Sequence, residues 1–196
     1  MLSVRQTSGD HTLLKVTFKL YTMSTVKLDP ITLERIDLIH PKLRAELHNI
    51  YKEICERLSG SAMCRFAYTL RTFTEQDALF AQGRTKPGKI VTKARAGRSY
   101  HNYGLAVDIV LLKDKDGNGT YESASWETNV DFDGDGVADW QEVVQVFKEY
   151  GWSWGGDWTR FPDMPHFEKP LGRTVAGLEQ QYKARNFLQG TTYVSL

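Results

Sequence analysis

Residues 99–108 read Ser-Tyr-His-Asn-Tyr-Gly-Leu-Ala-Val-Asp and lead into an apolar run that ends at Leu112. The β-prone composition from Leu105 onward predicts a buried strand with a single acid, Asp108, inside it. A buried carboxylate costs free energy unless a metal ion or another cation compensates it. His101 lies just before this strand and is a typical metal ligand. The segment indicates half of a metal site; the alternative is a structural histidine and an acid that pairs with an arginine.

A second segment with the same residue types follows much later, where residues 163–168 read Asp-Met-Pro-His-Phe-Glu. Pro165 excludes a helix here, so we expect extended chain. A catalytic zinc site uses three protein ligands and a water molecule, and His166 would be the third ligand. Asp163 would then lie beside the water as general base and pass the proton to the leaving amine.

The composition is that of one globular domain. The chain has 196 residues, of which 41% are hydrophobic and 25% charged, and its formal net charge is +1. A chain of this length can bury a stable core without disulfides or a structural metal. The charge gives no reason to expect binding to nucleic acid or membranes. No segment reaches the ~20 apolar residues that span a membrane. We expect no export signal within residues 1–23, because charged and polar side chains interrupt any apolar region there, namely Arg5, Asp10, His11 and Lys15.

Periodicity and turn residues predict a single α+β domain. Apolar side chains repeat every three or four positions after Pro41, which predicts a helix that Gly60 ends, and Thr74 is expected to cap a helix through Gln82. We further expect strands at 65–70, 105–112 and 166–168, helices at 139–150 and 174–186, and irregular chain at 84–100, 113–138 and 152–158. The domain organisation is an extension at 1–30 and a domain at 31–196 with an Asp-rich insertion at 113–139. The two cysteines are Cys55 and Cys64. We favour two unpaired thiols in the core, and a disulfide between them is the alternative.

Three motifs together resemble one family. They are S-x-H-x-x-G-x-A-x-D at 99–108, G-W-x-W-G-G-D-W at 151–158 and D-x-P-H-F at 163–167. This combination resembles the M15 peptidases, which include D-alanyl-D-alanine carboxypeptidases and dipeptidases and phage L-alanyl-D-glutamate endolysins. The resemblance covers residues 42–170, most of the chain, and its motifs are specific.

The resemblance implies a fold, a cofactor and a set of residue roles. The expected fold is a small antiparallel sheet flanked by helices, of the hedgehog/DD-peptidase type. The expected cofactor is Zn²⁺, with His101, Asp108 and His166 as its ligands and Asp163 as the catalytic base. Some family members have Glu at the position of Asp163, so the aspartate favours the endolysin-like branch.

A further family element, an arginine in an R-T-x-x-E-Q context, matches residues 71–76, Arg-Thr-Phe-Thr-Glu-Gln. The resemblance implies that the Arg71 guanidinium stabilises the oxyanion formed when water attacks the amide. Without the resemblance, Arg71 would be interpreted as a surface cation. Gln76 and Ser99 are expected to orient the substrate or a ligand.

Residues 131–142 read Asp-Phe-Asp-Gly-Asp-Gly-Val-Ala-Asp-Trp-Gln-Glu, which fits the calcium-loop pattern D-x-D-x-D-G-x5-E. No helix precedes the loop, as it would in an EF-hand, so this would be an isolated calcium loop. Bound calcium would order the insertion and could thereby control whether the zinc site is assembled. The alternative is a solvated acidic loop. Residues 114–119 begin a similar loop, but Ser125 stands where the last acid should be, which leaves half a site. The expected calcium ligands are Asp131, Asp133, Asp135, Asp139 and Glu142.

Aromatic side chains crowd the turn before residues 163–168. Trp152, Trp154, Trp158 and Phe161 are as compatible with core packing as with a wall of a substrate cleft. Trp154 is the candidate substrate contact.

The predicted function is zinc-dependent hydrolysis of amide bonds in peptidoglycan stem peptides, of the L-alanyl-D-glutamate endopeptidase type. One alternative is a D-alanyl-D-alanine carboxypeptidase or dipeptidase. An alternative of another class is a non-catalytic module that binds wall peptides, although such a decayed enzyme would be expected to lose Asp163 or Arg71. We expect a monomer that acts in the periplasm or cell wall and stays cytoplasmic until phage-type lysis or another export route releases it.

Overall fold

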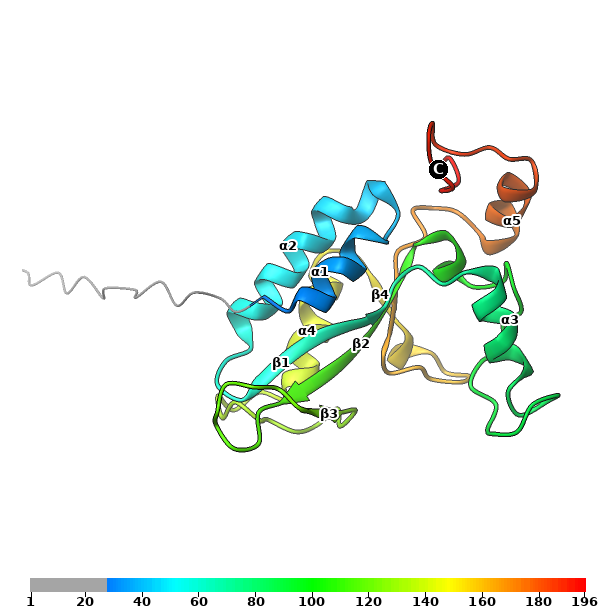
Figure 1. The fold of residues 1–196 in the computed structure, drawn as a ribbon. Helices are drawn as coiled ribbons and strands as arrows, with labels where there is room; N and C mark the ends of the chain where they lie inside the picture. Colours follow the sequence, from blue (N-terminus) through cyan, green and yellow to red (C-terminus); the bar gives the residue numbers. More distant parts are fainter. Residues whose placement is uncertain (1–27) are drawn as a thin grey trace, which may run out of the picture.

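The structure is a computed structural model that describes residues 28–196. Its architecture is α+β, with a five-stranded sheet in the order β1-β2-β5-β4 and β3 paired with β2, and all the pairings are antiparallel. The expected small antiparallel sheet flanked by helices is therefore confirmed (Figure 1). The strands are β1 (Ala62–Tyr68), β2 (Ala106–Lys113), β3 (Ser123–Ser125), β4 (Ser153–Trp154) and β5 (His166–Glu168). The α-helices are α1 (Pro30–Asp37), α2 (Pro41–Arg57), α3 (Phe73–Ala81), α4 (Asp139–Glu149) and α5 (Val175–Lys183), and single 3-10 turns lie at Tyr100–Tyr103 and Gly155–Asp157.

The core lies between the sheet and the helices α1, α2 and α4. Helix α2 begins at Pro41, as its periodicity predicts, and buries Leu43, Leu47, Ile50 and Ile54 along one face. Helix α4 packs against α2 and β4. Figure 1 shows α1, α2 and α4 grouped around β1 and β2, with α3 and α5 set apart from that group. This core fixes β2, the strand that carries Asp108, in the interior of the sheet.

The N-terminal boundary of the domain differs from the prediction. Asp29 accepts a hydrogen bond from the Thr32 amide, which caps α1, and its carboxylate pairs with Arg65 at 2.8 Å. The folded domain therefore includes Asp29 and Pro30, so the predicted extension at 1–30 ends too late. The rest of that extension, with the expected absence of an export signal, lies outside the described residues.

Three other local predictions need correction. The cap of α3 is Thr72 rather than Thr74, because the Thr72 hydroxyl and the Glu75 carboxylate form a reciprocal capping box. The segment expected to be wholly irregular, 113–138, contains β3, a short polar strand that pairs with the end of β2. The last helix, α5, is shorter than the predicted 174–186.

The thiols and the helices agree with two simpler expectations. Cys55 and Cys64 are free, the first half-buried and the second buried, as expected for core thiols. Within residues 28–196, no helix combines the length and the apolar character that crossing a bilayer requires.

Replacement of Phe147 should show how far the core holds the sheet in place. Phe147 is fully buried and stacks on Phe167 of β5, with ring centroids 4.1 Å apart. We expect Phe147→Ala to lower the free energy of unfolding by about 3–5 kcal/mol because it leaves a cavity. Phe161→Ala, at a ring that is 43% exposed, should change it by less than about 0.5 kcal/mol. Urea denaturation measures both, and equal losses would contradict the assignment of the core.

Candidate metal centre and cleft

Strand pairing and one short turn bring the three predicted zinc ligands together. Asp108 of β2 lies opposite His166 of β5 in the sheet register, and His101 comes from the 3-10 turn just before β2. His101 Nε2 lies 3.0 Å from Asp108 Oδ1 and 3.2 Å from His166 Nδ1. His166 Nδ1 lies 3.1 Å from the same Asp108 oxygen. Two imidazoles and one carboxylate therefore face a single point.

The other nitrogen of each ring has its own partner, which fixes the ring orientation. His101 Nδ1 donates to the Thr69 carbonyl at 2.8 Å, and His166 Nε2 donates to Glu168 Oε2 at 3.0 Å. Such partners orient metal-binding histidines and raise their basicity. Sequence reasoning missed Glu168 in this role. The available signal was the spacing of two, which places His166 and Glu168 on the same face of β5.

Electrostatics favour a cation at this point. Burial alone would raise the pKa of Asp108, but the charges and hydrogen bonds of His101 and His166 hold it well below its usual range. Burial alone would lower the pKa of His166, but the hydrogen bonds that its ring donates to Asp108 and Glu168 raise it to about 9. His166 is therefore protonated at neutral pH when no metal is bound, and a metal that binds there must displace that proton.

The donor set and its spacing fit zinc. Ligands of a tetrahedral zinc ion, at ~2.0–2.1 Å from the metal, lie roughly 3.3–3.4 Å from one another. The three donor atoms here are 3.0–3.2 Å apart. Nitrogen and carboxylate donors with only three protein ligands also leave a fourth position for water or substrate.

Arg71 lies on the wall of the cleft and contacts the Asp108 oxygen that the two histidines do not contact. Its Nη2 donates to Asp108 Oδ2 at 3.0 Å, and its backbone N–H donates to the His101 carbonyl at 3.0 Å. The Arg71 side chain thus holds the second carboxylate oxygen of a predicted ligand, while its backbone joins the end of β1 to the turn that carries His101. Pairing of Asp108 with an arginine was the alternative to a metal site in the sequence, and the structure contains that ion pair beside the two histidines.

The structure explains the R-T-x-x-E-Q motif and corrects one prediction in it. The Thr72–Glu75 capping box starts α3 immediately after Arg71, so that Gln76 lies in the first turn of α3. There Gln76 accepts a hydrogen bond from Arg71 Nη1 at 3.0 Å and donates to the Ala94 carbonyl at 2.8 Å. Gln76 is 0% exposed and does not line the cleft, so the expectation that it contacts substrate is wrong. It holds Arg71 in place.

Asp163 faces the cleft close to the predicted ligands. Burial raises the pKa of its carboxyl group and the charge of Asp108 raises it further, against the opposing effect of the two histidines and Arg71. Within residues 28–196 its carboxylate receives no hydrogen bond. A carboxylate with a raised pKa and free oxygens is a better proton acceptor than an ordinary exposed aspartate.

A cleft of about 460 Å³ opens over these residues. Ser99 lines it, as expected, and so do Trp158 and Phe161. Trp152 is buried in the core instead, and Trp154 points its indole N–H at the Met164 carbonyl, 2.7 Å away, outside the cleft lining. Trp154, the predicted substrate contact, therefore does not line this cleft, and the aromatic turn divides between core and cleft. The other lining residues are Arg71, Leu79, Val91, Thr92, Lys93, Ala94, Arg98, Tyr100, His101, Asp108, Asp163, Pro165, His166, Glu168 and Val175.

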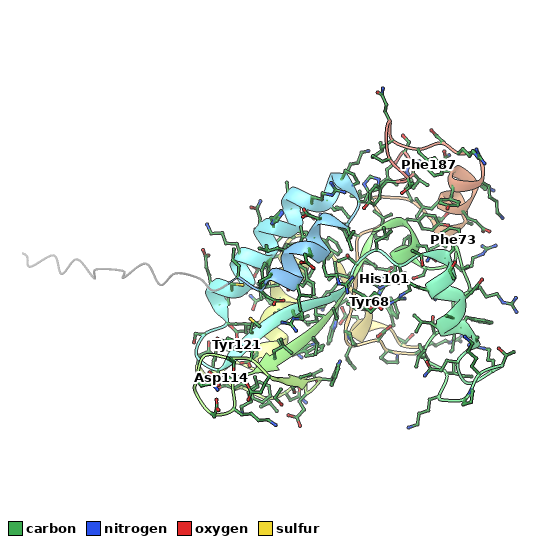
Figure 2. All side chains as sticks on the ribbon, viewed as in Figure 1. Tyr68, Phe73, His101, Asp114, Tyr121 and Phe187 are labelled. Atoms are coloured by element: carbon green, nitrogen blue, oxygen red, sulfur yellow. The ribbon has the colours of Figure 1, made fainter. Side chains whose placement is uncertain are left out.

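The acid-rich loops lie at the opposite end of β2. Figure 2 shows Asp114 and Tyr121 there, well away from His101. The five predicted calcium ligands gather in two overlapping groups, described below. The first Asp of each loop accepts backbone hydrogen bonds, Asp114 from residues 117–119 and Asp131 from Gly134 and Gly136. The half-site differs because, within the described residues, it forms no group of three acids that could hold an ion.

Known proteins match this chain across the metal centre. A family model described as D-alanyl-D-alanine carboxypeptidase matches residues 92–169. The peptidoglycan L-alanyl-D-glutamate endopeptidase CwlK of Bacillus subtilis (strain 168) is 46% identical over 129 residues, which cover 63% of this chain and 74% of CwlK. The chain belongs to the M15 peptidase family. Among solved structures, the L-Ala D-Glu endopeptidase ChiX of Serratia marcescens has a TM-score of 0.46 and 21% identity over 76% of this chain and 93% of ChiX.

The segment of this M15 peptidase that the family model matches includes the three predicted zinc ligands, His101, Asp108 and His166, and the predicted base, Asp163. Arg71 lies before it. The family match and the geometry both support the proposal for these four residues. The proposal for Arg71 is supported by the geometry alone.

Replacement of Gly155 should disturb the metal centre without touching a ligand. A Cβ at Gly155 would lie 2.5 Å from the Asp163 carbonyl oxygen and 3.1 Å from His166 Cβ. We expect Gly155→Ala to weaken zinc binding by about 10-fold to 100-fold because the His166 segment must shift. Gly177→Ala is the control, since its Cβ would come no closer than 3.4 Å to a neighbour. Competition with a zinc-binding dye measures both affinities, and an unchanged affinity in the Gly155 variant would contradict this packing.

Proposed function

We propose that this M15 peptidase hydrolyses the L-alanyl-D-glutamate bond of peptidoglycan stem peptides, with zinc held by His101, Asp108 and His166. The observation that carries the proposal is the meeting of these side chains with Asp163 at one cleft. The specific bond is suggested by CwlK, whose name states that activity. Such a substrate implies that the protein acts at the cell wall.

The residues divide the chemistry between them. Zinc, when bound, would lower the pKa of a water molecule and polarise the scissile carbonyl. Asp163 would take the proton from the attacking water and return it to the leaving amine. Its raised pKa supports this role, because a base must hold the proton long enough to pass it on.

Arg71 would act as a fixed positive charge on the cleft wall. Gln76 and Asp108 hold its two terminal nitrogens, so the guanidinium has little freedom to turn. A preorganised cation beside the reacting carbonyl stabilises the negative charge that develops on the amide oxygen. We propose that this electrostatic effect, together with the orientation of Asp108, is the role of Arg71.

The cleft lining suits an acidic peptide. Lys93 adds positive charge, and its Nζ lies 4.5 Å from the centroid of the Phe161 ring, whereas Arg98 already pairs with Glu179. Trp158 and Phe161 supply exposed aromatic surface for stacking against the peptide. A stem peptide with a free D-glutamate carboxylate matches this combination.

A second candidate, a D-alanyl-D-alanine carboxypeptidase, is favoured by the description of the family model. Digestion of purified peptidoglycan by the zinc-loaded protein separates the two. The endopeptidase releases peptides with a new amino-terminal D-glutamate, which amino-group labelling and mass spectrometry detect. Free D-alanine without that terminus would contradict our proposal in favour of the carboxypeptidase. Binding without any product would favour a non-catalytic module.

The role of Asp163 can be tested without removing the metal. We expect Asp163→Asn to reduce kcat by about 10²-fold to 10⁴-fold, the usual contribution of a general acid–base residue. Zinc content, measured by plasma mass spectrometry, should stay at one ion per chain, because Asp163 is not a ligand. Loss of zinc in this variant, or full activity, would contradict the assignment.

The pH dependence of hydrolysis follows from the same residue. Asp163 must be ionised to accept a proton, so activity should fall as the pH drops through its pKa. Because burial raises that pKa above its ordinary value of 3.8, the acid limb of the kcat/KM profile should lie above pH 3.8. Residual activity of Asp163→Asn should lack this limb, and an identical limb in both proteins would assign it to another group.

A further inference from the structure

We propose that residues 131–142 bind one Ca²⁺ ion, in a site separate from the metal centre of the cleft. The sequence pattern alone left a solvated acidic loop as an alternative. Three structural observations favour the ion: the way the carboxylates converge, a buried carboxylate oxygen without a partner, and the elements that the loop joins.

The five carboxylates form two overlapping groups of three. Ligand atoms of Asp131, Asp133 and Asp139 lie within 4.8 Å of one another, and so do those of Asp133, Asp135 and Glu142. Asp133 belongs to both groups and therefore links them. Carboxylates that approach so closely repel one another unless a cation lies between them.

Glu142 shows that the cluster is more than a solvated surface. Its side chain is only 7% exposed, and its Oε2 atom is buried without a hydrogen-bond partner. The nearby Arg57 pairs with Glu53 and Glu149 instead. A buried carboxylate oxygen with no donor is costly, and a cation among the facing acids would compensate it.

The pKa values of Glu142 and Asp139 are raised, as expected for acids that are buried close to other acids. Burial, followed by the charges of Asp135 and Asp133, raises the pKa of Glu142 to about 7. Burial and the same kind of repulsion raise the pKa of Asp139 to about 6. The two buried acids, Glu142 and Asp139, are therefore under-compensated, whereas backbone hydrogen bonds from Gly136 and Gly134 lower the pKa of the exposed Asp131.

The donor chemistry selects calcium. All five side chains offer oxygen, which calcium prefers, whereas the cleft offers the nitrogen donors that suit zinc. Gly136 has φ +96°, a conformation that favours glycine and that the sixth position of a calcium loop requires for its sharp turn. Helix α4 begins at Asp139, so Glu142 projects back from its first turn toward the loop.

The site would join three parts of the domain. The Ser59 amide, between α2 and β1, donates to Asp133 Oδ2 at 2.8 Å, and the Ser61 hydroxyl donates to the Phe132 carbonyl at 2.6 Å. The same loop continues into α4, which packs against α2. An ion bound here would tie the start of β1, the insertion and α4 together, so its expected effect is on stability.

Calcium titration of the zinc-loaded, calcium-free protein tests the site. Isothermal titration calorimetry with CaCl₂ should give one site per chain. Calcium at 100 times its Kd should raise the Tm by roughly 5–10 °C, because it binds only the folded state. Magnesium chloride should have a smaller effect, since Mg²⁺ favours octahedral sites that keep several waters. Heat and Tm report on the site whether or not hydrolysis occurs.

Two variants and a matched control make the result decisive. Glu142→Gln should abolish the calcium-dependent rise in Tm, and Glu122→Gln, the same change in the neighbouring loop, should keep it. Asp135→Asn alters an exposed residue and should weaken calcium binding by at least 10-fold without unfolding the domain. The proposal is overturned by no binding at 5 mM calcium, by equal effects of magnesium, or by equal calcium responses in all three variants.

Discussion

The carboxylate of Asp108 is the group on which this structure depends. One of its oxygens faces His101 and His166, and the other accepts a hydrogen bond from Arg71. An acid within an apolar strand is unfavourable unless positive charge surrounds it. Here Arg71 supplies part of that charge, and the metal ion proposed between the two histidines would supply the rest. Strand β2, which lies in the interior of the sheet, therefore carries the residue around which the site is built.

The rest of the domain keeps that carboxylate and its partners in register. Antiparallel pairing of β2 with β5 sets His166 opposite Asp108, and the core around Phe147 supports β5 from behind. Gly155 lets the chain pass close to the Asp163–His166 segment. The proposed calcium loop would act at the other end of β2, where it ties the insertion to the start of β1. One strand would then carry the catalytic ion at one end and be stabilised by a second ion at the other.

The sequence predicted the metal-facing residues better than their surroundings. The residue types pointed to His101, Asp108 and His166 as metal ligands, and the resemblance to M15 peptidases decided between that interpretation and a structural one. The sequence could not place Gln76 or Trp154, because whether a polar or aromatic side chain meets the cleft or the core depends on how loops pack over it. Gln76 is covered by the chain around Ala94, with which it shares a hydrogen bond.

The helices and strands also differ in how well the sequence predicted them. Helix α2 was predictable because its apolar repeat continues over several turns, whereas α1 and β3 are too short to show a period. The N-cap of α3 was misplaced by two residues because both Thr72 and Thr74 can cap a helix. The capping-box pattern does distinguish them, since Thr72 has Glu75 three positions later and Thr74 has an aspartate. Glu168 was missed because its role depends on which atom of His166 faces the metal.

Zinc stoichiometry and X-ray absorption of the purified protein, compared with His166→Ala and Asp108→Ala, test the central claim most directly. The account predicts one zinc per chain in the natural protein, with nitrogen and oxygen neighbours at ~2.0–2.2 Å, and a large loss of zinc in both variants. Full zinc occupancy in either variant, or sulfur among the neighbours, would show that the metal is held elsewhere and would contradict the account.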